Sequence, residues 1–240
     1  MSKLAKLAPV STWYNVVIPS TGKKNSYRAY NVGDEKALLM AEGDGDVLNM
    51  ITTIDVVVRN CLKEPVDSLT VYDLEFLFTL IRAKSVGEAV TITLGCDTPG
   101  CEEIENQVPI DLTTVYVPGS DPVGSAALII KQDATRGIKI VHPSVTEATI
   151  IDQMETDHDK SMTALALCIR EVYDGDEIID MKDEEKSDII AFVSTLDVSV
   201  REKAYEFINS MPQASIDAKY TCRNCKKEHT ETIKGIQNFF

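Results

Sequence analysis

Two short stretches decide the fold of this chain: Gly95-Cys96-Asp97-Thr98-Pro99-Gly100-Cys101 and Cys222-Arg223-Asn224-Cys225. Each lies between two segments in which apolar and polar residues alternate, the pattern of a β-hairpin that carries its cysteines at the tip. Zinc prefers four soft ligands at tetrahedral corners, and two facing tips of this kind supply them. We therefore predict that Cys96, Cys101, Cys222 and Cys225 bind one structural zinc ion, with no position left open for water.

Other interpretations of the cysteines stay open. Two residues between Cys222 and Cys225 are typical of a zinc knuckle, whereas the four residues between Cys96 and Cys101 are a looser match. Reduced thiols in surface turns, or one disulfide, would explain the same pattern, and His229 is an alternative ligand in place of one cysteine. The two remaining cysteines, Cys61 and Cys168, fall on apolar helical faces and are predicted to be core residues.

About 120 residues separate the two cysteine pairs, so the intervening chain is expected to be an insertion between two halves of a zinc-ribbon-like unit. Upstream, residues 13–32 alternate around the turn residues 19–22, and helices are expected from Asp34, from Val47 and from Asp67 or Ser68. Within the insertion, residues 144–147 form a capping box that opens a helical region to about Tyr173. We predict an α+β fold: an N-terminal β-hairpin plus helices, then a zinc-ribbon-like pair of β-hairpins with a helical insertion.

The expected organisation has four segments. They are an N-terminal hairpin and helical domain (residues 1–87), a first knuckle hairpin with short strands (88–145), a helical insertion (146–212), and a second knuckle hairpin with the C-terminal Phe239-Phe240 tail (213–240). Two aromatic side chains at a chain end are expected to dock, either on this chain or on a partner.

The charge of the chain is unevenly distributed. Its 240 residues are 44% hydrophobic and 26% charged, which is typical of a folded globular protein, and the net charge is −14. Residues 1–33 carry +5 and residues 218–240 carry +3, so the body between them carries −22. The acidic balance argues against a general nucleic-acid binder and against docking on an anionic membrane. The two basic ends are candidate docking surfaces for acidic proteins.

No catalytic pattern stands out. The three histidines, His142, His158 and His229, show no spacing to a serine or cysteine nucleophile that resembles a catalytic set. The acidic turns 44–46 and 174–176 lack the glycine and ligand positions of a calcium loop. There is no apolar run of 18 residues and no apolar core of a signal peptide near Met1. We predict a protein that is not an enzyme and has neither a small-molecule substrate nor a membrane span.

Several sequence blocks carry a family resemblance. They are Ile18-Pro19-Ser20-Thr21-Gly22-Lys23-Lys24, Glu35 to Ala41, Asn60-Cys61, Tyr72-Asp73-Leu74-Glu75-Phe76-Leu77-Phe78, Ile81-Arg82-Ala83-Lys84-Ser85-Val86-Gly87-Glu88, Glu206-Phe207-Ile208 with Met211-Pro212, the cysteine pairs, and Gly235 with Phe239-Phe240. At these blocks the chain resembles the baseplate hub subunit and hub assembly proteins of T-even-like contractile-tailed bacteriophages. The resemblance is weakest between about residues 113 and 200.

The resemblance implies a late structural or assembly protein that acts with other hub proteins at the centre of the tail baseplate. Its location would be the virion, or the host cytoplasm during assembly. Residues 82–85 (Arg82-Ala83-Lys84-Ser85) include two basic side chains, which are favoured at a helix C-terminus by the helix dipole. The alternative interpretation is that these residues contact a partner protein. A different class, a zinc-ribbon nucleic-acid-binding or transcription accessory protein, would use Arg223, Lys226 and Lys227, although stacking surface there is limited to Tyr220 and the terminal phenylalanines.

Overall fold

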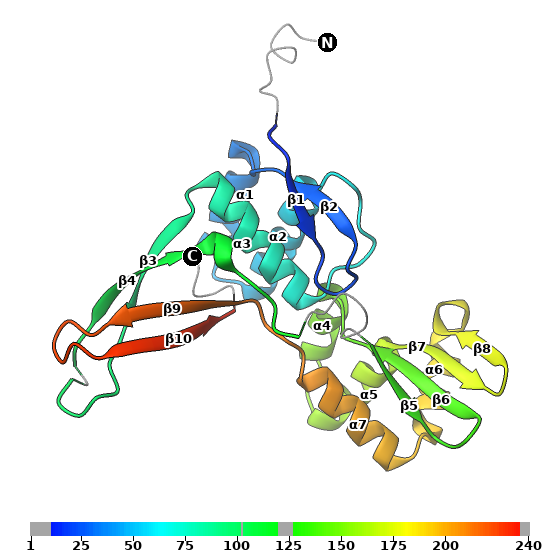
Figure 1. Ribbon diagram of the computed structural model, residues 1–240. Helices are drawn as coiled ribbons and strands as arrows, with labels where there is room; N and C mark the ends of the chain where they lie inside the picture. Colours follow the sequence, from blue (N-terminus) through cyan, green and yellow to red (C-terminus); the bar gives the residue numbers. More distant parts are fainter. Residues whose placement is uncertain (1–10, 102, 120–126, 236–240) are drawn as a thin grey trace, which may run out of the picture.

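The computed structural model describes residues 11–101, 103–119 and 127–235, and the chain has the predicted mixed α/β architecture (Figure 1). Its strands pair within three two-stranded antiparallel sheets and one four-stranded sheet. The strands are β1 (Tyr14–Val17), β2 (Lys24–Tyr27), β3 (Ala89–Leu94), β4 (Asn106–Asp111), β5 (Ala127–Lys131), β6 (Arg136–Val141), β7 (Ile169–Asp174), β8 (Glu177–Asp180), β9 (Ser215–Thr221) and β10 (Glu228–Lys234). The α-helices are α1 (Val32–Asp44), α2 (Val47–Cys61), α3 (Val71–Ser85), α4 (Val145–Asp152), α5 (Asp157–Cys168), α6 (Lys186–Thr195) and α7 (Val198–Asn209).

The N-terminal hairpin β1–β2 packs with helices α1, α2 and α3 around one core. Local signals explain the helix ends, because Asn31 and Asp34 form a capping box at the start of α1 and Gly45 ends it in a left-handed conformation. Asp46 then caps α2, and Thr70 with Asp73 caps α3. The helix expected to begin at Asp34 therefore begins at Val32, and the one expected from Asp67 or Ser68 begins at Val71.

Helix α3 lies between two cores, and both of its sides are therefore apolar. Leu74, Leu77 and Ile81 face the N-terminal core, whereas Tyr72 and Ala83 face a second core built from the hairpins β3–β4 and β9–β10. Each fully buried leucine or isoleucine contributes about 1.5–3 kcal/mol by leaving water. The helix is thus the element that joins the N-terminal part of the chain to the two cysteine-bearing hairpins.

The residues between the two hairpins form a lobe with its own sheet and core (Figure 1). The sheet has the strand order β5-β6-β7-β8, and helices α5, α6 and α7 supply apolar side chains to the same core. The chain enters and leaves this lobe side by side, because Tyr116 and Ser215 exchange two backbone hydrogen bonds of 2.9 and 2.8 Å. Two main-chain segments therefore meet at the neck of the lobe.

The lobe differs in detail from the helical insertion expected from the sequence. Its helices do not continue to Tyr173, because α5 ends at Cys168 and the chain turns directly into β7. Strand β6 pairs with β7, so residues on both sides of the expected boundary at 145 share one sheet. The capping box at Ser144 is confirmed, since its side chain accepts a hydrogen bond from the amide of Glu147 at the start of α4. The four-segment division stays a prediction.

Candidate metal centre

The four cysteines predicted to bind zinc lie at the tips of two neighbouring hairpins. Figure 1 shows β3–β4 and β9–β10 running side by side, with both tips at the same end. Strand β9 contributes Ile216 and Ala218 to the core that also contains Val108 and Ile110 of β4, so apolar packing aligns the two hairpins. The tips then meet in a separate cluster of Cys96, Cys101 and Cys222, against which Ile104 packs.

The backbone of each tip adopts the tight turn that a knuckle requires. In the first tip, Gly100 has a φ of 84°, and the amide of Cys101 donates to the carbonyl of Thr98 over 2.9 Å. In the second, Cys222 donates to Lys227 over 2.9 Å and accepts from Lys226 over 3.0 Å. Lys226 has a φ of 61°, the left-handed region that favours glycine. Both turns direct the cysteine side chains towards the same point.

The four sulfurs are spaced as a tetrahedral metal site requires. Their Sγ atoms all lie within 4.8 Å of one another, and Cys96 Sγ is 3.8 Å from Cys225 Sγ. Zinc–sulfur bonds of about 2.3 Å at tetrahedral corners place sulfurs about 3.8 Å apart, so the donor set fits zinc. All six cysteines are free thiols, and the disulfide interpretation is not the arrangement present.

Hydrogen bonds to the sulfurs favour the thiolate that a metal binds. The backbone amide of Lys227 lowers the pKa of the exposed Cys225 thiol to about 6. Burial alone would raise the pKa of Cys222, but the amides of Cys225 and Asn224 outweigh it and the pKa is lowered. The Asn224 side chain donates to Cys101 Sγ over 3.2 Å and lowers its pKa, but burial and the neighbouring Cys225 and Cys222 outweigh this contact and the pKa of Cys101 is raised.

Three polar side chains to which the sequence gives no such role hold the two tips together. Asn106, which is buried on β4, accepts a hydrogen bond of 2.9 Å from the amide of Arg223 and donates to the carbonyls of Leu94 and Gly95. Asn224 makes the contact to Cys101 described above. Tyr220 of β9 places its hydroxyl 2.6 Å from the carbonyl of Gly95. The cysteine spacing gave no signal for these residues, since they act across the pair of hairpins.

His229, the alternative ligand, lies beside the cluster. Its Nε2 is 3.3 Å from Cys96 Sγ, and its ring stacks on Tyr220 with centroids 5.1 Å apart. A nucleic-acid-binding role would need the Tyr220 ring to stack on bases, and His229 already stacks on one face of that ring. Four sulfurs within 4.8 Å of one another can occupy all four positions of one tetrahedral metal ion that joins the hairpins, and such a site has no vacant position for chemistry.

The other cysteines and histidines considered in the sequence lie away from the cysteine cluster. Cys61 and Cys168 are fully buried, and burial raises the pKa of their thiols to about 11 and about 12 respectively, as expected of core residues. His142 is buried against Tyr72 and Phe207, whereas His158 is exposed on α5. The terminal phenylalanines, Phe239 and Phe240, and the basic residues Lys3 and Lys6 lie outside the described residues.

The expected acidic turns are also structural. Gly45 and Asp46 separate α1 from α2, and the Asp46 carboxylate accepts from the amides of Leu48 and Asn49 as a helix cap. Gly175, with a φ of 63°, forms the turn between β7 and β8. Neither turn is included in the group of metal-ligating side chains found among the described residues, which contains the four cysteines.

A family model described as T4 bacteriophage base plate protein matches residues 12–240, a range that contains both hairpins and all four cysteines. The chain belongs to this family. No curated protein and no solved structure matches it. The prediction of a T-even-like base plate protein is confirmed, and the family indicates a structural component of the phage tail that contacts other tail or base plate proteins. Among the described residues, no helix is both long and apolar enough to cross a membrane.

The blocks that carried the resemblance meet in this base plate protein through buried polar contacts. Asp73 is fully buried on α3, and its carboxylate accepts from the amide and hydroxyl of Ser20 over 2.9 and 2.5 Å. Glu75, two residues further on, accepts from the amide of Ala214 over 3.0 Å, just before β9 begins. One helix thus holds the first hairpin turn with one carboxylate and the start of the last hairpin with another.

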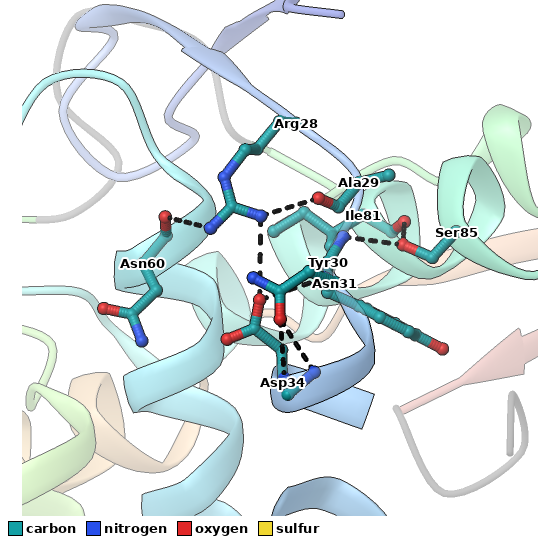
Figure 2. Close-up of polar contacts among 9 residues, drawn as sticks. Arg28, Ala29, Tyr30, Asn31, Asp34, Asn60, Ile81 and Ser85 are labelled. Carbon is teal, nitrogen blue, oxygen red and sulfur yellow. Dashed lines mark hydrogen bonds and ion pairs between the residues drawn. The ribbon is translucent and has the colours of Figure 1, made fainter. Parts of the chain in front are cut away.

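A second junction joins two more of these blocks, at Asn60 and at Ser85 (Figure 2). The Arg28 guanidinium donates to the carbonyls of Ala29 and Asn60 over 2.8 and 3.0 Å and lies 3.6 Å from the Asp34 carboxylate. The hydroxyl of Ser85 accepts from the amide of Tyr30 over 3.0 Å. The side-chain contact of Ser85 gives it a structural role within the block for which a partner contact is the alternative, whereas Asn60 contributes its backbone carbonyl.

Proposed function

We propose that this base plate protein is a component or assembly factor of the central baseplate hub, and that it acts through protein–protein contacts and not as an enzyme. The observation that carries the proposal is the family match over residues 12–240. Within that family, the blocks at residues 18–24 and 72–88 resemble hub subunits, and α3 joins them to the rest of the chain.

The outer face of α1, formed by Val32, Leu39 and Met40, is the surface we propose for one such contact. These side chains are 80%, 61% and 63% exposed, and they lie opposite the buried Leu38 and Ala41 on the same helix. Three large apolar side chains grouped on one helical face are typical of a protein interface. Lys36 lies on the same face between Val32 and Met40, and Glu35 and Glu42 lie at its edge, so we expect a partner segment that is mainly apolar with charged residues of both signs around it.

Fractionation of infected cells tests the hub assignment. A tagged chain should co-purify with tail hub proteins, and electron microscopy of labelled particles should place it at the baseplate centre. Replacing both Leu39 and Met40 by Asp should abolish co-purification while the free energy of unfolding in urea stays within about 0.5 kcal/mol of the wild-type value, because surface positions tolerate substitution. Co-purification only with peripheral baseplate proteins would contradict the hub assignment.

We further propose that Cys96, Cys101, Cys222 and Cys225 hold one structural zinc ion. The 3.8 Å separation of the Cys96 and Cys225 sulfurs and the turn geometry support this. Zinc would crosslink residues that are 129 positions apart in the chain, and so tie the two hairpins at their tips. The closed donor set supports a structural role.

The zinc proposal predicts about one zinc per chain in the purified protein, measured by elemental analysis. Cys222→Ser should release the metal and lower the free energy of unfolding. Cys168→Ala is the matched control, because it removes a buried thiol away from the hairpin tips and should leave the zinc content unchanged. Metal-free protein with undiminished stability would contradict a structural zinc ion.

A further inference from the structure

Tyr220 and His229 form a cross-strand pair that reaches from the second hairpin to the first. They are register partners in β9 and β10, and their rings are stacked with an interplanar angle of 17°. The Tyr220 hydroxyl lies 2.6 Å from the carbonyl of Gly95, and the His229 Nε2 lies 3.3 Å from the sulfur of the next residue, Cys96. The pair therefore contacts two consecutive residues of the first knuckle.

Most donors to the other three sulfurs come from the second knuckle, and the Thr98 side chain of the first knuckle also acts on Cys225. Asn224 donates its side-chain N–H to Cys101. Backbone amides of the same turn point to Cys222 and to Cys225. Four thiolates around a divalent ion carry a net negative charge, and N–H donors to sulfur stabilise that charge. Cys96 receives the corresponding contact from His229, on the strand that follows the turn.

We propose that His229 is a positioning residue of the metal centre, donating its Nε2–H to Cys96 Sγ and orienting that thiolate towards the ion. This inference rests on the proposed zinc site. Stacking on Tyr220 holds the imidazole plane, and the Tyr220 hydroxyl also contacts the Glu231 carboxylate at 2.5 Å, which limits movement of the ring. His229 thus links the second hairpin to a ligand of the first, and the four sulfurs remain the ligands.

Metal affinity of full-length variants at one fixed pH tests this role. Wild type, His229→Phe and His229→Gln are titrated with Co²⁺, whose thiolate charge-transfer and ligand-field absorption report the ligand set, and Zn²⁺ affinity is then measured by competition with a chelator. We expect all three to show the four-thiolate Co²⁺ spectrum. His229→Phe should bind Zn²⁺ about 10-fold more weakly, as is common when an outer contact to a ligand is lost. His229→Gln should recover part of the loss, because its amide can donate to the sulfur.

Two controls separate positioning from folding. His158→Gln, at an exposed histidine of α5, should leave Zn²⁺ affinity unchanged. The urea midpoint of metal-free His229→Phe should match that of the metal-free wild type, whereas a general structural role would lower it. Equal Zn²⁺ affinity in wild type and His229→Phe would overturn the positioning role and leave the metal centre standing. A changed Co²⁺ absorption spectrum in His229→Phe, with one ligand lost, would instead make His229 a metal ligand. A wild type that binds no Co²⁺ would overturn both the proposed metal centre and this inference.

Discussion

Replacing Asp73 by Ala removes the contact that joins α3 to the first hairpin turn. The carboxylate is fully buried and accepts three hydrogen bonds, from the amide of Ser20 (2.9 Å), the hydroxyl of Ser20 (2.5 Å) and the amide of Thr70 (3.0 Å). Ser20 lies 53 residues earlier in the chain. We expect this substitution to destabilise the N-terminal part of the protein more than the loss of a single buried hydrogen bond does.

The magnitude follows from the groups left behind. Two part-buried backbone amides, those of Ser20 and Thr70, would lose their acceptor at about 1–3 kcal/mol each, and the Thr70 contact is the Asp73 half of the capping box of α3. Relief from burying a carboxylate offsets part of this cost. We therefore expect Asp73→Ala to lower the free energy of unfolding by about 3 kcal/mol. Ser20→Ala removes the hydroxyl bond alone and should cost about 1 kcal/mol.

Trp13 makes the assay specific. It is the single tryptophan of the chain and lies next to β1, so its fluorescence reports unfolding of the first hairpin. Urea unfolding of wild type, Asp73→Ala, Ser20→Ala and the double variant gives a double-mutant cycle. We expect a coupling energy of about 1 kcal/mol between the two sites. An Asp73→Ala cost no larger than that of Ser20→Ala, or strictly additive effects, would refute the proposed junction.

Three further changes test other parts of the structure. Burial lowers the pKa of His142, so the unfolded chain binds a proton more readily than the folded one as the pH falls below about 6.5. Stability should fall there by at most about 1.4 kcal/mol per pH unit, and His142→Phe should remove that part of the pH dependence in urea midpoints between pH 5 and 8. Lys226 has a left-handed backbone conformation that glycine adopts without strain, so Lys226→Gly should stabilise the metal-loaded protein by up to about 1 kcal/mol and raise its melting temperature. A lower melting temperature would contradict the strain argument. Leu77→Ala opens a cavity at a fully buried position of α3 and should cost about 2–5 kcal/mol in urea unfolding.

Local patterns predict much of the fold and the cluster of four cysteines. Alternation around the turns at residues 19–22, 96–101 and 222–225 predicted three hairpins that are present, because turn chemistry and two-residue periodicity act over short distances. Cysteine spacing predicted the four residues whose sulfurs the structure brings together. The start of α3 was placed three to four residues too early, since capping side chains at both Asp67 and Thr70 fit the same sequence pattern.

What the sequence by itself determined is therefore the set of hairpins, most helices and the chemistry of the candidate metal centre. Tertiary structure alone decided which distant segments meet: β6 with β7, Asp73 with Ser20, Glu75 with Ala214, and His229 with Cys96. The physical reason is that periodicity and capping are written in residues a few positions apart. Contacts between residues 53 to 139 positions apart depend on how the apolar faces of α3 and the hairpins pack together.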